Sequence, residues 1–334
     1  MILSQLLAKV YRGEQVESVH RGHIVVARPD GVTLATVGDP SIPSFIRSAA
    51  KPVQVMPVLL SGADKHFGFS DAELAVMMAS HNGEATHTQT VRSIQHKIGI
   101  DESALQCGVH APMHFDTAEQ LTRKGKAVTA LHNNCSGKHS GMIAGILHRG
   151  LDPGNYLDPS HPYQNEILEI LVKFAGLDRT EIRIATDGCS APNYFMPLVN
   201  MALIYARLAE GRIKPARRVF DIMSRHPFMI AGTDRFDTKI MEVMQTRLIS
   251  KIGAEGIRCV GIRGESPVAI ALKIEDGNPR ASGAVLLEAL RQLELIGPAE
   301  LQTLWEFASP ILRNHAGLKI GRIEPCFMME GTTV

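Results

Sequence analysis

Strand-like patterns occupy both ends of this chain and helical patterns fill its middle, and this division limits the folds that it can adopt. The segments typical of strands are residues 16–28, 32–37, 257–262, 267–276 and 317–325. Gly31 lies in the turn signal between the first two, because glycine supplies a positive φ there. Late in the chain, residues 282–297 predict a helix whose C-terminal end is at Gly297.

Apolar residues at helical spacing dominate from about residue 48 to residue 245. The segments with this pattern are residues 71–78, 88–99, 117–125, 141–150, 163–176, 194–211 and 216–226. A helix is expected to start near Ser48, with Pro52 tolerated in its first turn and Pro57 producing a kink. Ser70 has the position of an N-cap residue for the segment that follows it.

The simplest architecture is therefore one α/β (α+β) domain with a helical lobe inserted between sheet strands. We expect sheet-forming segments at about residues 1–45 and 246–334, and a mainly helical lobe at about residues 46–245. The domain would span residues 1–334, since no internal repeat or long polar linker divides the sequence.

Composition excludes several classes of function. The 334 residues carry a formal net charge of +1, so no strong field would recruit nucleic acid or an anionic membrane. Five cysteines are an odd and sparse set, which indicates a reducing compartment rather than a disulfide framework. The N-terminal segment lacks the features of a signal peptide, and no apolar run approaches the ~20 residues of a membrane span. We expect a soluble cytoplasmic protein.

Ser48 and Lys51 are three residues apart at the expected start of a helix, and positions i and i+3 share a helix face. A serine hydroxyl becomes a nucleophile when a base removes its proton, and a lysine can be that base if its pKa falls towards neutrality. A Ser-x-x-Lys spacing alone also fits a surface pair.

Two further motifs follow in an order that strengthens the catalytic interpretation. Ser80 and Asn82 form a Ser-x-Asn element, and Lys251 begins a Lys-x-Gly element. Ser-x-x-Lys, Ser-Asp-Asn and Lys-Thr-Gly are the set used by β-lactamases and penicillin-binding proteins. The match departs from that set at His81 and Ile252, and Lys273 is a second lysine in the same half of the chain.

Two cysteines and a lysine suggest a metal site. Cys135 and Lys138 lie at a probable helix start, and Cys189 follows a loop with Asp187. Two thiolates suit zinc, with His132 and His139 available as further ligands. The spacing is not that of a zinc finger, so the cysteines could equally be buried small hydrophobes.

Six segments together resemble the Rhizobium etli-type (class 3) L-asparaginases of the asparaginase II family, over nearly the whole chain. They are RSAAKP at 47–52, ASHNGE at 79–84, NNCSGKHSGM at 133–142, TDGCSAP at 186–192, AGTDRFDT at 231–238 and KIGAEG at 251–256. The resemblance implies a fold like that of serine β-lactamases, hydrolysis of L-asparagine to L-aspartate and ammonia, and a homodimer.

The same resemblance implies two Ser–Lys tandems and a zinc site. By motif, Ser48 with Lys51 is one tandem, and Ser80 with Lys251 is the other. Cys135, Lys138 and Cys189 match the family's zinc ligands, with the metal expected to order loops and help to place substrate.

An amino-acid substrate needs its two charged ends held. Arg47 is a candidate for the α-carboxylate by bidentate geometry, and Asp187 or Glu84 for the α-ammonium. Asn82 and His139 are further candidate substrate contacts, although asparagines of this kind also serve as turn residues.

Three rival functions stay open at the level of sequence. A glutaminase or other serine amidohydrolase would use the same residues on a different substrate. A zinc-dependent binding protein would need Cys135 and Cys189 but neither serine. A cysteine hydrolase would use Cys135 as the nucleophile next to His139.

Overall fold

The computed structural model describes residues 3–331, and the chain in it divides into two compact units. The sheet unit holds residues up to 49, residues 196–210 and residues from 239 onwards, whereas the helical unit holds residues 50–195 and 211–238. Both ends of the predicted domain, residues 1–2 and 332–334, lie outside the described residues.

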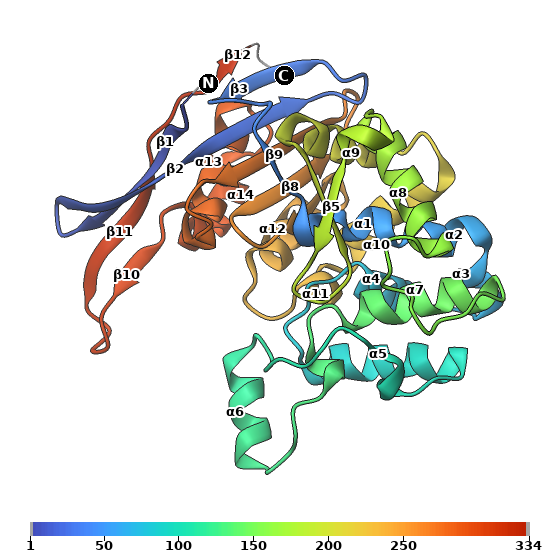
Figure 1. Ribbon diagram of the computed structural model, residues 1–334. Coiled ribbons are helices and arrows are strands. Elements are labelled where there is room, and N and C mark those ends of the chain that lie inside the picture. Colours follow the sequence, from blue (N-terminus) through green and yellow to red (C-terminus); the bar gives the residue numbers. More distant parts are fainter. Residues whose placement is uncertain (1–2, 332–334) are drawn as a thin grey trace. The chain divides into compact units, whose positions relative to one another are not determined.

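The sheet unit is built on an antiparallel sheet whose strands run in the order β10-β11-β1-β2-β9-β8-β7, with β3 paired to β2 and β12 to β3 (Figure 1). Its strands are β1 (Gln5–Arg12), β2 (Gln15–Ala27), β3 (Thr33–Val37), β7 (Leu248–Ile252), β8 (Ile257–Ile262), β9 (Val268–Ile274), β10 (Ile311–Arg313), β11 (Lys319–Pro325) and β12 (Glu330–Gly331). The segments at the two ends of the chain therefore share one sheet, as predicted.

Helices cover the centre of this sheet. Every residue of β8 is buried, and because successive side chains point to opposite faces of a sheet, both faces of this strand are covered. The helix α9 (Leu198–Glu210) packs on β2, β8 and β9, and α13 (Ser282–Gln292) packs on β9 and β11. The unit also contains β4 (Pro43–Phe45), α14 (Pro298–Thr303) and α15 (Trp305–Ala308).

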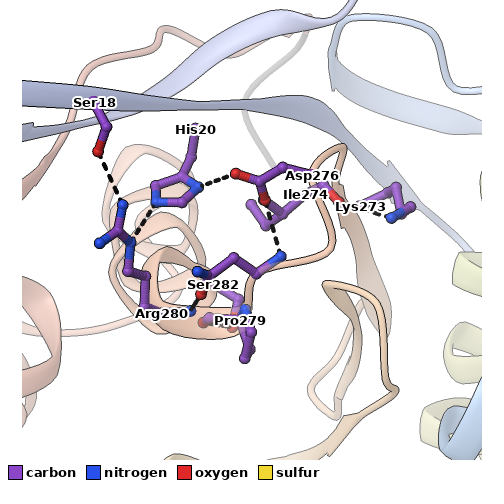
Figure 2. A network of polar contacts seen from close by, with 9 residues as sticks. Ser18, His20, Lys273, Ile274, Asp276, Pro279, Arg280 and Ser282 are labelled. Atoms are coloured by element: carbon purple, nitrogen blue, oxygen red, sulfur yellow. Dashed lines mark hydrogen bonds and ion pairs between the residues drawn. The ribbon is translucent and has the colours of Figure 1, made fainter.

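A polar network joins β2 to the loop after β9 (Figure 2). The buried His20 ring contacts Asp276 through Nδ1 at 2.8 Å, and Arg280 Nε donates to His20 Nε2 at 2.8 Å. A second nitrogen of Arg280 donates to Ser18 Oγ at 2.9 Å. Because both ring nitrogens have partners, this histidine cross-links the sheet and has no nitrogen left for proton transfer.

The helical unit packs its helices around α7. Its helices are α1 (Lys51–Gln54), α2 (Met56–Ser61), α3 (Ala63–His66), α4 (Asp71–Met77), α5 (Ala85–Ile98), α6 (Phe115–Arg123), α7 (Ser136–His148), α8 (Pro162–Ala175), α10 (Lys214–Arg225) and α11 (Pro227–Ile230). Two elements have residues in both units: the helix α12 (Phe236–Met244) and the strand β6 (Pro192–Pro197). The strand β6 pairs antiparallel with β5 (Arg183–Thr186).

Three glycines explain why α7 can lie at the centre. A Cβ on Gly137 would lie 2.1 Å from the Val76 carbonyl oxygen of α4, and a Cβ on Gly145 would lie 2.4 Å from the hydroxyl of Tyr163 on α8. A Cβ on Gly141, between them, would lie 2.9 Å from side-chain atoms of Met77. Spaced four residues apart, these glycines form one face of the helix on which neighbouring elements approach closely.

The α/β class predicted from the sequence is confirmed, but three local expectations differ. Pro57 separates two helices instead of kinking one: α1 ends at Gln54 and α2 begins at Met56, because proline offers no N–H for the helical ladder. Gly297 is the N-cap of α14, since α13 already stops before Glu294, whose φ is 57°. The segment 194–211 is helical only from Leu198, and its start is strand β6.

Within residues 3–331 no helix has the length and apolar character needed to cross a membrane.

Candidate active site

The residues between α4 and α5 form an extended turn that carries Ser80. The helix α4 is capped by Ser70 as predicted, through a reciprocal capping box with Glu73. Beyond it, the Ser80 N–H donates to the Ile230 carbonyl at 3.0 Å and the Asn82 N–H donates to the Ala231 carbonyl at 2.8 Å. These backbone bonds hold the turn against the segment that precedes α12.

Lys51 lies at the start of α1 with its side chain buried. Its Nζ donates to the Ala79 carbonyl at 2.5 Å, to Ser80 Oγ at 3.0 Å and to the Asn134 carbonyl at 3.3 Å. All three partners of the Lys51 nitrogen are oxygen atoms. The structure thus brings one serine and one lysine of the predicted set into direct contact, Ser80 with Lys51.

The remaining catalytic candidates belong to the sheet unit. Arg47 and Ser48 lie in a 3-10 helix (Arg47–Ala50) directly before α1. Lys251 is buried on β7, where its Nζ donates to the Ile252 carbonyl at 3.1 Å. Lys273 lies on β9 and donates to the carbonyls of Glu255 and Ile274. The pairings of Ser48 with Lys51 and of Ser80 with Lys251 stay predictions.

The two cysteines and the lysine predicted as a metal site come together in the helical unit. Cys135 immediately precedes α7, Lys138 is in its first turn, and Cys189 lies in the loop between β5 and β6. Lys138 Nζ donates to Cys189 Sγ at 2.9 Å. All three side chains are buried.

Charges within this cluster oppose one another. A hydrogen bond with Cys189, followed by the nearby charges of Lys51 and Lys138, lowers the pKa of the Cys135 thiol well below its usual range, and the same hydrogen bond raises the pKa of Cys189. Burial disfavours the charge of Lys138, but the two sulfurs outweigh it and raise its pKa. The cluster therefore favours a thiolate at Cys135 and an ammonium at Lys138.

This donor set fits zinc in its chemistry. Thiolates are preferred zinc ligands, and the lowered pKa of Cys135 favours its thiolate form. Lys138 would have to lose its proton before its nitrogen could bind, as any protonated ligand must. No group of three or more His, Cys, Asp or Glu side chains suited to a metal occurs within residues 3–331, so a site here depends on the lysine.

Asn82 and Glu84 are joined to the segment before α12. Both carboxylate oxygens of Glu84 accept hydrogen bonds from Thr233, at 2.9 and 2.6 Å, and one also accepts from Asn82. Burial opposes ionisation of Glu84, but these bonds outweigh it and lower its pKa. Asn82 Oδ1 accepts from Arg235 at 2.9 Å. Asn82 and Glu84 thus fix the turn and orient Arg235.

His81 is a structural residue of this turn. Its Nδ1 accepts from the Gly83 N–H at 3.1 Å, and its Nε2 lies 3.0 Å from Ser136 Oγ, which itself donates to the Leu131 carbonyl. The Nε2 must therefore carry the proton. Burial, followed by the nearby His87 and Lys51, keeps the pKa of His81 well below its usual value, so the ring stays neutral.

Two other predicted substrate contacts lie around the sulfur cluster. His139, next to Lys138 on α7, is buried, and its Nδ1 lies 2.6 Å from the Tyr156 hydroxyl. Burial and the Lys138 charge lower its pKa to about 4. Asp187 begins the loop that carries Cys189, where its Oδ1 accepts from the Gly188 N–H at 2.8 Å.

Backbone strain gathers in the same motifs. Among residues 3–331, the non-glycine residues with positive φ include Arg47 (54°), Ser190 (68°), Asp234 (57°) and Glu255 (60°). Each lies in one of the motif segments recognised in the sequence. Strained backbone of this kind collects at functional sites, where the surrounding structure over-determines it.

Arg235 and Tyr156 are site residues that sequence reasoning missed. Arg235 falls inside the segment AGTDRFDT, so the motif itself was a signal, although no role followed from it. Tyr156 is buried next to His139 but precedes α8 in a loop with no motif. Only the tertiary fold brings it to the cluster.

Comparison with known proteins identifies the family of this chain. The profile of one family of amidohydrolases, described as L-asparaginase II, matches residues 8–325. The chain therefore is an amidohydrolase enzyme and belongs to the L-asparaginase II family. No curated protein sequence matches it significantly.

Solved structures with a distantly similar fold include a Bacillus glutaminase, at 14% identity and a TM-score of 0.37, with 82% of this chain and 91% of that chain covered. The glutaminase Mglu in its tris and glutamate form is 16% identical at a TM-score of 0.37, covering 88% of this chain and 64% of that one. A candidate beta-lactamase from Bacteroides dorei is 10% identical at a TM-score of 0.42, covering 81% and 93%.

Proposed function

We propose that this amidohydrolase is an L-asparaginase, which hydrolyses the side-chain amide of L-asparagine to L-aspartate and ammonia. The family described as L-asparaginase II supports this substrate. The observation that carries the proposed chemistry is the buried contact between Lys51 Nζ and Ser80 Oγ, since an amine beside a hydroxyl offers a path for the proton transfer that a serine hydrolase needs.

In the proposed mechanism Ser48 attacks the amide carbon, and Lys51, three residues later in the chain, accepts its proton as a neutral amine. Ser80 exchanges a proton with Lys51 across their 3.0 Å contact and passes it to the departing ammonia. Lys251 is the lysine of the second tandem. Water then hydrolyses the ester of the serine, with the same groups acting in reverse.

Backbone N–H groups at the start of the helix would meet the negative oxygen of the tetrahedral intermediate. A donor of this kind contributes about 3 kcal/mol to the stability of the transition state.

Charged residues would hold the two ends of the substrate. Arg47 is the proposed partner of the α-carboxylate, since a guanidinium binds a carboxylate through two parallel bonds. We assign the α-ammonium to Asp187, because the carboxylate of Glu84 is already occupied by Thr233 and Asn82.

Cys135, Lys138 and Cys189 would hold a zinc ion. When bound, zinc supplies a fixed positive charge that polarises nearby carbonyl groups and orders the loops that carry its ligands. Removal of zinc by a chelator should lower the rate of ammonia release, with the rate restored on adding zinc back.

The test of the function is ammonia release from L-asparagine and L-glutamine by wild type, Ser48→Ala, Ser80→Ala and Ser140→Ala. Ser140 is the matched control, because its buried Oγ has no hydrogen-bond partner among the described residues. We expect turnover of L-asparagine by wild type and the control, and loss in both other variants. Faster release from L-glutamine would make the protein a glutaminase. No release from either substrate by folded, zinc-loaded protein would refute the proposal and favour a binding protein.

The quaternary structure and location proposed for this enzyme, a cytoplasmic homodimer, follow from the resemblance and composition of the sequence. Light scattering on the purified protein tests the dimer directly.

A further inference from the structure

Asn134 is held in place through all four of its polar groups. Its carbonyl oxygen accepts a hydrogen bond from Lys51 Nζ at 3.3 Å, and its backbone N–H donates to His110 Nε2 at 3.0 Å. Its side-chain Nδ2 donates to Met113 Sδ at 3.5 Å, and its Oδ1 accepts from Cys135 Sγ at 3.1 Å. The position of the carbonyl that Lys51 contacts is therefore set by the groups that bind the rest of this residue.

Two of these groups belong to residues 107–114, which we call the strap. At one end of the strap, the N–H groups of Met113 and His114 donate to the Asn82 carbonyl at 2.9 and 3.2 Å. At the other end, two consecutive strap carbonyls accept from the Asn133 side chain at 2.8 and 3.1 Å. The strap thus joins the turn between α4 and α5 to the segment that precedes α7.

The backbones of these three segments lie very close together. Gly83, in the turn, has a φ of 77°, and a Cβ there would lie 2.9 Å from the His132 carbonyl oxygen and 3.2 Å from Pro112 Cα of the strap. Glycine permits both this φ and this close approach. The turn, the strap and the segment before α7 therefore form a closed circuit of contacts, and both ends of that circuit meet at the nitrogen of Lys51.

Hydrogen-bond accounting fixes the form of the His110 ring. Its Nδ1 lies 2.7 Å from the Ala111 carbonyl oxygen, which can only accept, so Nδ1 carries the proton. Its Nε2 faces the Asn134 N–H, which can only donate, so Nε2 accepts. The neutral imidazole is thus the strap side chain that holds the backbone of Asn134.

We propose that His110 is a positioning residue of the reaction: by accepting the Asn134 N–H, it keeps the Asn134 carbonyl on the nitrogen of Lys51. The inference rests on the proposed function, in which Lys51 exchanges a proton with Ser80. If Asn134 shifts, Lys51 loses one of the three oxygen atoms that direct its nitrogen towards that serine. A misplacement of about 1 Å in a reacting group can lower a rate by about 100-fold.

The first experiment compares His110→Leu with His114→Leu, which removes an imidazole from the same strap. The His114 ring contacts Thr117 of α6 through Nδ1, and its substitution keeps the backbone N–H that binds Asn82. Ammonia release from L-asparagine gives kcat and KM. We expect His110→Leu to lower kcat by about 10- to 100-fold with KM little changed, and His114→Leu to leave both unchanged. His110→Gln should restore most of the rate, because its side-chain oxygen can accept the Asn134 N–H near the position of Nε2.

The second experiment tests the position of Lys51 without turnover. Lysines are acetylated with acetic anhydride, and the rate at each lysine is read by mass spectrometry of peptides. Lys51 and Lys251 are both buried and should react slowly in wild type. We expect His110→Leu to speed acetylation of Lys51 by about 3- to 10-fold, the factor given by loss of one hydrogen bond. The rate at Lys251 should not change, since only general unfolding would expose both lysines.

The proposal is overturned if His110→Leu keeps the kcat of wild type, if His110→Gln loses as much as His110→Leu, or if acetylation of Lys51 is the same in wild type and His110→Leu. A wild-type protein that releases no ammonia from L-asparagine or L-glutamine would refute the proposed function instead. The acetylation rates would then decide alone whether the strap positions Lys51.

Discussion

Replacement of Gly137 by alanine should destabilise the protein strongly. Alanine is the better helix former by about 1 kcal/mol, so an unhindered substitution would be stabilising. Here the new Cβ would lie 2.1 Å from the carbonyl oxygen of Val76 and 2.7 Å from its carbonyl carbon. Backbone atoms cannot rotate away, so α4 or α7 must move by roughly 1 Å to restore ordinary contact distances, and overpacking of this kind costs about 1–3 kcal/mol or more.

Gly145→Ala is the matched comparison, because its Cβ would meet the Tyr163 side chain, which has torsions through which it can move. We expect urea denaturation to give a lower midpoint for Gly137→Ala than for Gly145→Ala, with similar slopes. Gly137→Ala should also lose metal affinity, since Cys135 and Lys138 flank the substituted position. A Gly137→Ala protein as stable as wild type would refute the reasoning that close packing of backbones sets this helix in place.

Three further predictions concern single side chains. Lys51→Met should lower the rate of ammonia release by about 10²–10⁴-fold, whereas Lys65→Met, at an exposed position, should leave it unchanged; equal rates would exclude Lys51 as the base. Arg280→Met should lower the free energy of unfolding by about 1–3 kcal/mol, because a buried imidazole loses its donor; an unchanged urea midpoint would contradict this. Burial opposes ionisation of Glu73, but its bonds to Lys97 and Ser70 outweigh it and lower the pKa. Stability should therefore fall as the pH drops below the ordinary pKa of glutamate, near 4.3, and Lys97→Met should flatten this part of the pH profile.

Local patterns in the sequence were enough to predict the elements whose signals are self-contained. The strand predicted at residues 257–262 has the same bounds as β8, because a short apolar run between turn residues is typical of a buried strand. Ser70 was found as an N-cap because its capping box is complete within four residues. The strand β1 was not defined, because its short alternation becomes a strand only through pairing with β2 and β11.

The candidate site could be predicted as far as its residues lie in motifs. Lys51, Ser80, Cys135 and Cys189 all came from short segments of recognisable composition. The contact between Lys51 and Ser80 could not be predicted, because spacing along a helix relates Lys51 to Ser48 and says nothing about a turn 29 residues away. Tyr156 could not be predicted either, because only the tertiary fold brings it to His139.

The strained backbone at Ser190 and Asp234 bears on how far this enzyme could be made more stable. Glycine adopts a positive φ without steric cost, whereas other residues lose roughly 1 kcal/mol or more there. Ser190→Gly and Asp234→Gly are thus natural choices for raising the melting temperature. Both positions neighbour groups assigned to the site, Cys189 and Arg235. A higher melting temperature obtained with these glycines would therefore leave Cys189 and the Arg235 guanidinium less firmly held. The substitutions that most readily stabilise this enzyme thus lie in the loops on which its chemistry depends.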